Sequence, residues 1–454
     1  MKKILIAGVT SGSGKTTTVL GILKALHEKY QIQSYKVGPD YIDTKFHTRI
    51  TGRPARNLDN YLVPDAQTLR YLFTAGTDGL DLGIVEGVMG LYDGLGTDKD
   101  AYSTASIAKQ LDIPVILVIN ARATSTSAAA ILQGFLDFDS DVPICGVIIN
   151  NVMSANHYQL VAGAINRYLH LPVLGYLPHN PKLALPSRQL GLVPDDELAG
   201  VDKKIALIAK EVKTHVDLPK LVSLAKDTGP EQADPFNIPR VKLRLGIAQD
   251  EAFNFYYADN LKLLKKTGVT LVPFSPLNDQ HLPDVNALYF GGGYPEEFAA
   301  QLAANDSLRV EIKRFSQQNK PIYAECGGLM YLGKFLQEGN QQYPMVGIFN
   351  GKSEMTSRLR KFGYCIATSR QDTLIAEKGC KVVGHEFHHS TFAPLDDTCR
   401  PVLTMKKIRD HQLVDTWNGG YQLRQTFASY LHVHFYQDQR LFIKFLQRLG
   451  AEYQ

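Results

Sequence analysis

The sequence predicts an α/β fold divided into two domains, and three observations support that prediction. Short apolar runs alternate with amphipathic segments through the first half of the chain, which is typical of a mostly parallel sheet covered by helices. The stretch 226–240 then carries three prolines and no hydrophobic periodicity, as linkers do. A second alternating series follows. We therefore predict an N-terminal domain over 1–226, a linker over 227–241 and a C-terminal domain over 242–454.

The predicted elements are strands with helices between them. In the first domain we expect strands at 3–7, 83–85, 114–119, 145–149 and 173–176, and helices that include 16–28 and 124–136. In the second domain we expect strands at 243–248, 287–290, 322–324 and 428–431. A chain of 454 residues exceeds what one hydrophobic core usually supports, which agrees with two domains.

The composition is that of an ordinary globular enzyme. Hydrophobic residues make up 44% and charged residues 21%, and the net charge of +4 is too small to indicate nucleic-acid binding. Five cysteines without a C-x-x-C pair suit a reducing compartment. The N-terminal apolar run is too short for a signal peptide, and no stretch reaches the roughly 18–20 apolar residues of a membrane span. We expect a cytoplasmic protein that binds no membrane.

A glycine-rich loop follows the first predicted strand. Residues 8–17 read GVTSGSGKTT and lead into a helix, so their backbone N–H groups and the helix N-terminus can hold phosphates. Lys15 would neutralise the β- and γ-phosphates, and Thr16 would hold Mg²⁺. The loop is one residue longer than the ordinary P-loop and resembles that of dethiobiotin synthetase. The predicted ATP-binding residues in it are Gly12, Gly14, Lys15, Thr16 and Thr17.

Three carboxylates occur where a metal–phosphate site would need them. Asp40 and Asp43 follow a short β-like run, and Glu86 ends an apolar strand, the place where α/β sheets carry their chemistry. Mg²⁺ prefers oxygen ligands and keeps several waters, so one or two carboxylates suffice. We predict Asp40 and Glu86 as metal ligands together with Thr16, and Asp43 beside the substrate. The alternative for each is a helix cap or a solvated turn residue.

Cys326 is the candidate nucleophile of the second domain. It follows an apolar strand and precedes two glycines, which is the pattern of a strand–turn–helix elbow. A free thiol is only a few per cent ionised at pH 7, so a base is needed, and His432 follows another apolar run. The glycines after 287–290 can offer backbone N–H groups to an oxyanion. The alternative is a buried structural thiol.

Taken together, these motifs resemble the cobyrinic acid a,c-diamide synthase family of the cobalamin pathway along essentially the full chain. The supporting segments are 8–17, 36–43, 85–93, 146–152, 185–193, 291–296, 325–329, 384–388 and 430–435. The resemblance implies a synthetase domain with a P-loop and a mostly parallel sheet, fused to a class I glutamine amidotransferase-like α/β domain. It also implies a glutamine-hydrolysing carbon–nitrogen ligase, in which ATP phosphorylates the a and c acetate side chains of a corrinoid and ammonia displaces the phosphate.

The resemblance also implies roles for individual residues. Cys326 would form the thioester and His432 would act as its base, while Asn150 lies where relatives read adenine or is merely a strand-end cap. The predicted substrate contacts are Tyr41, Ile42, Asp43, Ser187 and Arg188, and the predicted oxyanion-hole residues are Gly292, Gly293 and Gly327. The cluster of His385, Glu386 and His388 follows a β-like run, which favours a cross-sheet or substrate contact over a metal site.

One position departs from the class I amidotransferase pattern. These enzymes usually carry a glutamate two residues after the catalytic histidine, where this chain has His434. Cobalamin-type amidotransferases share the departure. It leaves open what orients His432.

The sequence leaves several functions to be distinguished. A nickel-sirohydrochlorin a,c-diamide synthase or a cobyric acid synthase would use the same chemistry. A P-loop positioning ATPase belongs to a different class, and it would give Cys326 and His432 no function. Thr10 stands where positioning ATPases carry an extra lysine, which counts against that class. The expected partners are small molecules, namely a corrinoid or related tetrapyrrole, ATP and glutamine, with Mg²⁺ as cofactor. The macrocycle, its metal, the order of amidation and a homodimeric state stay open.

Overall fold

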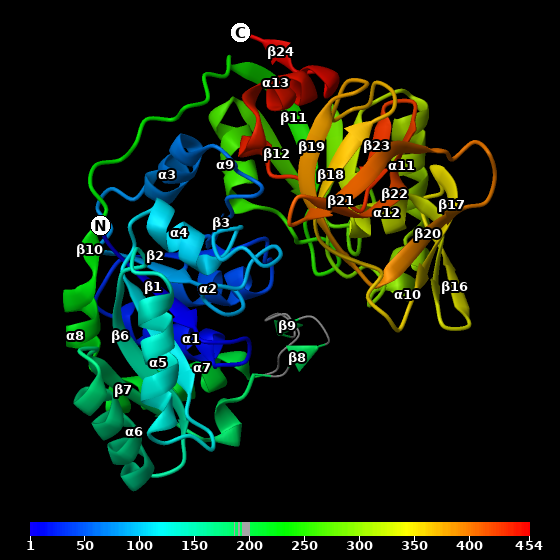
Figure 1. The fold of residues 1–454 in the computed structure, drawn as a ribbon. Coiled ribbons are helices and arrows are strands. Elements are labelled where there is room, and N and C mark those ends of the chain that lie inside the picture. Colours follow the sequence, from blue (N-terminus) through cyan, green and yellow to red (C-terminus); the bar gives the residue numbers. More distant parts are fainter. Residues whose placement is uncertain (186, 189–190, 193–199) are drawn as a thin grey trace. The chain divides into compact units, whose positions relative to one another are not determined.

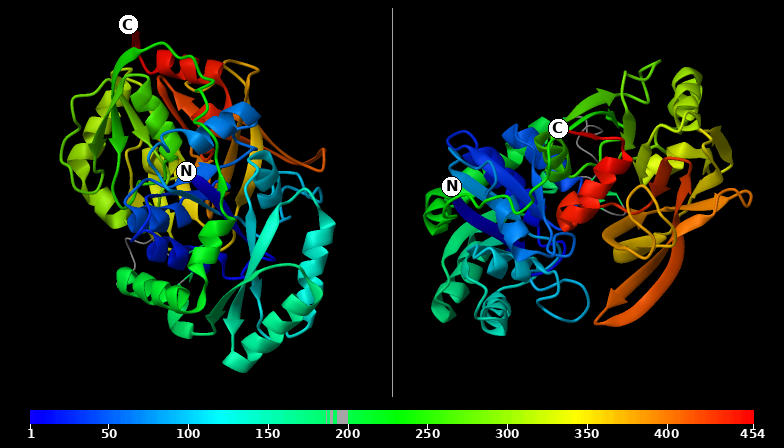
Figure 2. Two further views of the ribbon diagram at one scale, coloured as in Figure 1. Left: turned by 90° about the vertical axis from the view of Figure 1, so that its left-hand side faces the viewer. Right: turned by 90° about the horizontal axis from the view of Figure 1, so that it is seen from above.

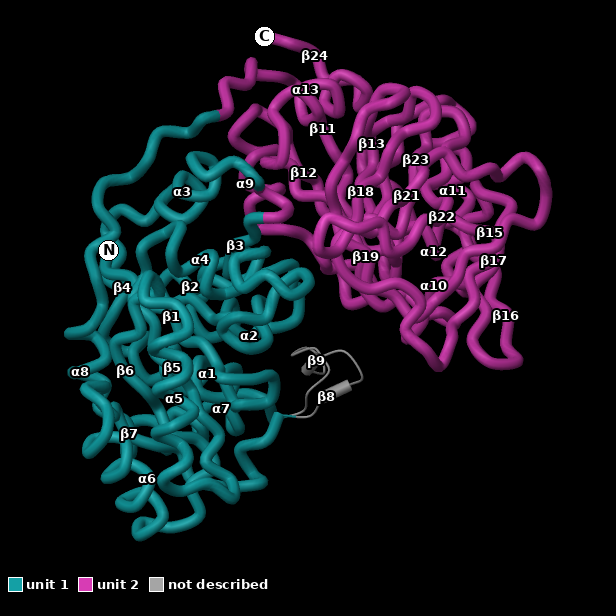
Figure 3. The backbone as a smooth tube through the Cα atoms, in the orientation of Figure 1, with its two compact units in different colours: residues 1–60, 64–235 teal, residues 61–63, 236–454 magenta. Residues whose placement is uncertain are grey.

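The computed structural model describes residues 1–185, 187–188, 191–192 and 200–454, with backbone alone at 187–188 and 191–192. The chain forms two compact units (Figure 3), one of residues 1–60 and 64–235 and the other of residues 61–63 and 236–454. The division after residue 235 lies inside the stretch 227–241 that the sequence predicts as a linker. Among the described residues, no helix combines the length and apolar character needed to cross a membrane.

The first unit is built on a sheet whose strands are parallel except for the short β10, which pairs with the beginning of the central strand β1 (Figure 1). Its order is β3-β2-β4-β1-β5-β6-β7, and β10 pairs antiparallel with β1. The strands are β1 (Lys2–Gly8), β2 (Ile32–Val37), β3 (Arg56–Leu58), β4 (Leu82–Glu86), β5 (Val115–Asn120), β6 (Ile144–Val152), β7 (Val173–Pro178) and β10 (Lys226–Asp227). Every residue of β2 and β4 is buried, because helices cover both faces of the sheet.

Helices connect these strands. They are α1 (Lys15–Leu26), α2 (Asp43–Thr51), α3 (Ala66–Thr74), α4 (Thr104–Gln110), α5 (Ser127–Phe138), α6 (Ala155–Tyr168), α7 (Val201–His215) and α8 (Leu218–Leu224), with the 3-10 turn η1 (Pro181–Leu183) and the short pair β8 (Ser187–Arg188) and β9 (Gly191–Leu192). Helices α1 and α7 pack closely because Gly21 has no side chain: a Cβ there would lie 2.5 Å from Val212. The carboxyl ends of β1, β2, β4 and β6 meet at one edge of the sheet, which positions the site described below.

The second unit contains a large sheet that is half parallel and half antiparallel. Strands β12-β11-β13-β14-β23 run parallel, and β22-β21-β18-β19 continue the sheet antiparallel. The strands are β11 (Val241–Ala248), β12 (Val269–Phe274), β13 (Ala287–Phe290), β14 (Ile322–Glu325), β18 (Lys361–Ser369), β19 (Lys381–His388), β21 (Pro401–Arg409), β22 (Gln412–Leu423) and β23 (Thr426–Ser429). A second sheet, β16-β15-β17-β20, consists of β15 (Gly333–Glu338), β16 (Gln341–Pro344), β17 (Phe349–Met355) and β20 (Ser390–Pro394).

Helices of the second unit lie around the parallel half of its sheet. They are α9 (Ala258–Lys266), α10 (Ala299–Ala304), α11 (Asp306–Gln317), α12 (Gly327–Leu332) and α13 (Gln439–Arg448), with the 3-10 turn η3 (Phe435–Gln437). After α13 the chain ends in β24 (Glu452–Tyr453), which pairs antiparallel with β11. Both views of Figure 2 show this red end of the chain beyond α13.

The predicted α/β class is confirmed, and the structure differs from the prediction in some element limits and in several strands that were not predicted. The last predicted strand, 428–431, is shifted, because β23 spans Thr426–Ser429 and ends before Leu431. The cluster of His385, Glu386 and His388, expected after a β-like run, forms the last part of strand β19. The antiparallel strands from β18 to β22 were not predicted, since their mixed polar and apolar residues give no continuous apolar run.

Candidate active sites

The glycine-rich loop between β1 and α1 is held in shape by short-range hydrogen bonds. The Ser13 hydroxyl donates to the Thr10 carbonyl at 2.7 Å and accepts the Thr10 N–H at 3.0 Å. Gly14 adopts φ 93°, which glycine accepts without strain. The Asn150 amide at the end of β6 donates to the Ser13 carbonyl at 2.9 Å. Asn150 therefore supports the loop from the neighbouring strand.

Lys15 and Thr16 begin helix α1 and face the acidic residues of the sheet. Lys15 is 8% exposed, and its ammonium donates to the carbonyls of Met89 and Thr10. Burial and the nearby Lys36 lower the pKa of Lys15 to about 8. The Thr16 hydroxyl donates to Oε1 of Glu86 at 2.6 Å. A polyphosphate in this loop would offer Lys15 a partner of opposite charge.

Glu86 is the centre of a buried ionic cluster at the carboxyl end of β4. Lys36 lies 2.9 Å from Glu86 and 2.6 Å from Asp43, and Nε2 of His47 lies 2.8 Å from the second oxygen of Glu86. Burial alone would raise the pKa of Glu86, but Lys36 and His47 outweigh it and hold the pKa below its usual range. Burial and the Asp40 carboxylate raise the pKa of Asp43. Several carboxylates thus share a single buried lysine.

The segment before α2 is mostly buried, and Asp40 holds its backbone in place. Oδ1 of Asp40 accepts the N–H groups of Ile42 and Asp43 at 2.8 and 2.7 Å, so Asp40 caps the start of the helix. Tyr41 and Ile42 are each 8% exposed. The helix-cap alternative considered for these carboxylates thus applies to Asp40, whereas Asp43 is held by Lys36.

The oxygen atoms of this cluster fit a magnesium ion in type. Thr16 and Glu86 present hard oxygen donors 2.6 Å apart beside a phosphate loop, and Mg²⁺ completes its shell with phosphate oxygens and water. No group of three or more His, Cys, Asp or Glu side chains in a metal-holding arrangement occurs among the described residues. A site built from one or two side chains plus phosphate does not need such a group.

A substitution at Gly14 tests how closely the loop is fitted. We expect Gly14→Ala to weaken ATP binding about tenfold or more, because a Cβ would lie 1.9 Å from Nδ2 of Asn150 and the φ of 93° costs an L-residue about 1–2 kcal/mol. Isothermal titration with ATP measures the effect. The matched control is Gly134→Ala in α5, where no atom lies within 4 Å of the added Cβ. Equal ATP affinity for both variants would contradict the fitted loop.

Lys36 and His47 are site residues that the sequence did not single out. His47 lies four residues after Asp43 on α2, so the two side chains share one helix face. That spacing was the available signal, but a lone histidine on a helix is more often structural. Only the fold brings His47, fully buried, against Glu86.

In the second unit, Cys326 occupies a strained elbow between β14 and α12. Its backbone has φ 48° and ψ −104°, a conformation that non-glycine residues rarely adopt and that is common at nucleophiles. The Cys326 N–H donates to the Ser429 carbonyl at 2.7 Å, which ties the elbow to β23. Burial, together with Glu296 and Glu386, raises the pKa of the Cys326 thiol, so a base must accept its proton.

His432 lies three residues beyond β23, the strand next to β14. The pairing of Glu325 with Ser429 brings the two strand ends together, which places His432 close to the elbow. Two backbone hydrogen bonds to His385, at 2.9 and 3.2 Å, fix the His432 main chain. Burial and the nearby His388 lower the pKa of His432 to about 3, so its imidazole is neutral at pH 7.

The predicted oxyanion-hole glycines lie around this pair. A Cβ on Gly292 would be 2.6 Å from Cε1 and 3.3 Å from Nε2 of His432, so the Nε2 edge of the ring faces this glycine. A Cβ on Gly327 would lie 3.3 Å from the Gly293 nitrogen, so these two backbones also approach closely. Gly293 itself has φ 155° and leaves no room for a side chain beside the Ala252 carbonyl.

The cluster on β19 borders the histidine. The rings of His385 and His432 are 5.1 Å apart, and the Trp417 indole N–H donates to Glu386 at 3.2 Å. His388 stacks on Tyr430 with ring centroids 3.7 Å apart and lies 3.6 Å from Glu386. These contacts are cross-strand and local. They hold the cluster in the sheet next to Cys326.

Glu325 is the further residue that the sequence did not single out. It ends β14 directly before Cys326, is 1% exposed, and its Oε2 lies 3.4 Å from Nδ1 of His432. A glutamate before a nucleophile gives no recognisable signal, because adjacent residues of a strand point to opposite faces. The sharp turn at Cys326 removes that alternation.

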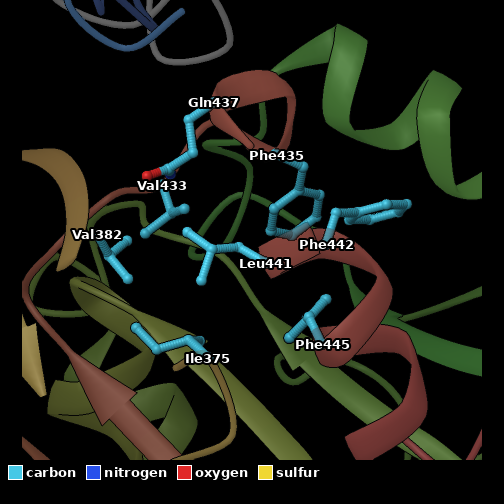
Figure 4. A pocket seen from close by; sticks show the side chains of 8 residues that line it. All are labelled: Ile375, Val382, Val433, Phe435, Gln437, Leu441, Phe442 and Phe445. Carbon is cyan, nitrogen blue, oxygen red and sulfur yellow. The ribbon is translucent and has the colours of Figure 1, made fainter. Parts of the chain in front are cut away.

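An apolar pocket (Figure 4) is lined by Ile375, Val382, Val433, Phe435, Gln437, Leu441, Phe442 and Phe445. Its polar member, Gln437, already exchanges hydrogen bonds with the Val383 backbone, so the pocket offers no reactive group. The side chains of Ser187 and Arg188, predicted to contact ATP or substrate, lie outside the described part of the chain.

A family model described as a CobQ/CobB/MinD/ParA nucleotide binding domain matches residues 4–193, and one described as a CobB/CobQ-like glutamine amidotransferase domain matches residues 244–440. A protein of Limosilactobacillus reuteri (strain DSM 20016) named cobyrinate a,c-diamide synthase is 73% identical over 454 residues, 100% of both chains. The chain belongs to the cobyrinate a,c-diamide synthase family.

More distant members extend the same match over nearly full length. The cobyrinate a,c-diamide synthase of Streptococcus sanguinis (strain SK36) is 53% identical over 98% of both chains, and that of Salmonella typhimurium is 46% identical over 95% of both. The family predicted from the motifs is thus confirmed, as is the enzyme class, a glutamine-dependent amide-forming ligase. The nucleotide-binding domain supports ATP use, and the family implies small-molecule substrates.

Proposed function

We propose that this protein amidates the a and c acetate side chains of cobyrinate, or of a closely related tetrapyrrole, with ATP and glutamine as co-substrates. The observation that carries the proposal is the presence of both a phosphate loop with its ionic cluster and a cysteine elbow with its histidine, in a chain that aligns end to end with relatives of that name. We assign ATP-dependent activation to residues 1–226 and glutamine hydrolysis to residues 242–454.

In the first site, the substrate carboxylate attacks the γ-phosphate of ATP. The carboxylate oxygen forms the new bond to phosphorus, and ADP leaves, which gives an acyl phosphate. Lys15 lies where it can pair with the β- and γ-phosphates, and Lys36 offers a buried positive charge beside Asp43. Thr16, Glu86 and Asp40 would hold Mg²⁺, which would supply further positive charge against the phosphates. Tyr41, Ile42 and Asp43 are proposed to contact the substrate.

In the second site, Cys326 attacks the carboxamide carbon of glutamine. His432 accepts the thiol proton and passes it to the departing amine, so ammonia leaves and a glutamyl thioester remains. Backbone N–H groups of Gly292, Gly293 and Gly327 are proposed to hold the oxyanion. Water then hydrolyses the thioester to glutamate and restores the thiol.

Amide formation joins the two half-reactions. Ammonia attacks the acyl carbon of the acyl phosphate, a C–N bond forms, and inorganic phosphate leaves with the bonding pair. Two such cycles amidate the two acetates. The proposed location is the cytoplasm, Asn150 is proposed to reach the adenine, and Ser187 and Arg188 are proposed to contact ATP or the macrocycle.

A panel of macrocycles tests the proposal. Purified protein is incubated with ATP, Mg²⁺, glutamine and either cobyrinate, nickel-sirohydrochlorin or a later corrinoid intermediate, and amide groups are counted by mass spectrometry. We expect two amidations of cobyrinate. Preference for nickel-sirohydrochlorin would assign the neighbouring activity, and amidation of a corrinoid that already carries the a and c amides would indicate a cobyric acid synthase.

The ionic cluster around Glu86 is expected to be needed for acyl-phosphate formation. We expect Glu86→Gln and Asp43→Asn to slow acyl-phosphate formation by about 100-fold or more, because phosphoryl transfer between two anions depends on the charges arranged around it. Positional oxygen exchange in labelled ATP, measured with macrocycle but without glutamine, reports this step alone. The matched control is Glu28→Gln, which removes an exposed carboxylate paired with Lys213. Unchanged exchange in both variants would remove these residues from the phosphorylation site.

A further inference from the structure

The second unit contains a carboxylate that lies close to the imidazole of His432. Class I amidotransferases orient the catalytic imidazole with a carboxylate, and the usual position for it holds His434 in this chain. The His434 ring instead lies against Tyr257, with centroids 5.0 Å apart. The carboxylate that approaches Nδ1 of His432 is that of Glu325, at 3.4 Å. Both side chains are almost completely buried.

The two oxygens of Glu325 have different surroundings. Oε1 accepts the Tyr323 hydroxyl at 2.7 Å and the Val433 N–H at 3.3 Å, while Oε2 faces Nδ1 of His432. The Tyr289 hydroxyl donates to the same carboxylate. Donors from β13, from β14 and from the segment after β23 therefore fix the carboxylate in one orientation, with Oε2 directed at the imidazole.

We propose that Glu325 is the positioning residue of His432, in place of the carboxylate that related enzymes carry two residues after the histidine. The inference rests on the proposed glutamine hydrolysis. With Oε2 in front of Nδ1, the tautomer that carries its proton on Nδ1 is favoured, which leaves the lone pair on Nε2, the nitrogen whose edge faces Gly292. The separation of 3.4 Å is long for an N–H···O bond, as catalytic hydrogen bonds often are before substrate binds.

The charges of the pair support the same assignment. Burial raises the pKa of Glu325 to about 8, and burial lowers the pKa of His432 to about 3 with help from His388. A carboxylate at Glu325 with a neutral His432, or an imidazolium at His432 with a neutral Glu325, is therefore unfavourable in this buried site. A carboxylate facing an imidazolium compensates both charges. An imidazolium formed at His432 when it takes the proton of Cys326 would favour the ionised form of Glu325, because the two opposite charges then compensate each other.

The substitution Glu325→Gln tests the proposal sharply. The donors around Oε1 require the amide oxygen at that position, so the amide NH₂ must face Nδ1 of His432. Nδ1 then accepts a hydrogen bond, the proton moves to Nε2, and His432 can no longer take the proton of Cys326. We expect kcat for glutamine hydrolysis to fall about 100-fold or more, as a carboxylate-to-amide change does in related triads. The KM for glutamine and amidation with added ammonia should change less than about threefold.

A second variant separates positioning from simple anchoring. Tyr323→Phe removes one hydrogen bond to Oε1 but leaves Oε2 in front of His432, so we expect a loss in kcat of only about threefold to tenfold. Similar losses in both variants together with lowered thermal stability would overturn the proposal, as would a Glu325→Gln enzyme with wild-type kcat. Because glutamine hydrolysis is measured without macrocycle, a wild type that hydrolyses glutamine but amidates nothing would refute only the proposed function.

Discussion

Cys326→Ala should abolish glutamine-dependent amidation while amidation with ammonium salts and ATP continues. In the proposed mechanism the thiol is needed only to form the glutamyl thioester, and that step cannot proceed without a nucleophile. We expect the glutamine-dependent rate to fall about 1,000-fold or more, because groups that act as one catalytic unit are lost together. Ammonia supplied in solution still reaches the acyl phosphate. Product amides counted by mass spectrometry, with glutamine or ammonium chloride as nitrogen source, measure both activities.

The matched control is Cys365→Ala. Cys365 lies in β18 and is 1% exposed. Burial raises the pKa of its thiol well above the usual range, as expected of a structural cysteine. Its backbone shows no elbow: it pairs with Gly384 in a regular antiparallel ladder. Both nitrogen sources should support amidation by this variant. Normal glutamine use by Cys326→Ala would refute the amidotransferase assignment of the second unit.

The parts of the sites that could be predicted from sequence are those made by neighbours in the chain. The loop from Gly8 to Thr17 has a local framework, since Ser13 and Lys15 both donate to the Thr10 carbonyl, although Asn150 supports it from a distant strand. The elbow at Cys326 is equally local, because a strand, a strained residue and two glycines suffice to specify it. Motifs of this kind are specified mainly by neighbouring residues, so they can be recognised in a single sequence.

The partners that complete each site come from residues far apart in the chain. Glu325 approaches His432 across 107 positions only because β14 pairs with β23, and His47 approaches Glu86 because α2 packs over the strand ends. The sequence around Glu325 gives no signal of this role, and the spacing of His47 from Asp43 on α2 is a weak one, because a lone histidine on a helix is more often structural. The antiparallel strands β18 to β22 were not predicted for a related reason. They are stabilised by cross-strand pairs of side chains, and the hydrophobic pattern along one segment does not show which residues will pair.

Lys15→Ala should stop amidation with glutamine and with ammonia alike. The lysine is the positive side chain of the phosphate loop, and its place between the Thr10 and Met89 carbonyls holds the ammonium inside that loop. Burial lowers its pKa to about 8, so it stays mostly charged at pH 7, and bound phosphates would favour the charged form further. Without Lys15, no positive side chain of the loop stabilises the negative charge that develops on the phosphates in the transition state. We therefore expect the rate of ATP-dependent amidation to fall about 1,000-fold or more.

Two comparisons make this loss specific to the first site. Lys24→Ala removes a lysine from the last turn of the same helix, away from the loop, and should leave amidation unchanged. In Lys15→Ala, Cys326 should still react with 6-diazo-5-oxo-L-norleucine, a glutamine analogue that alkylates amidotransferase cysteines, because glutamine binds in the other unit. Retained amidation with either nitrogen source would exclude Lys15 from the mechanism. Loss of Cys326 labelling as well would mean that the substitution acts through folding, since a change confined to the phosphate loop leaves the cysteine elbow intact.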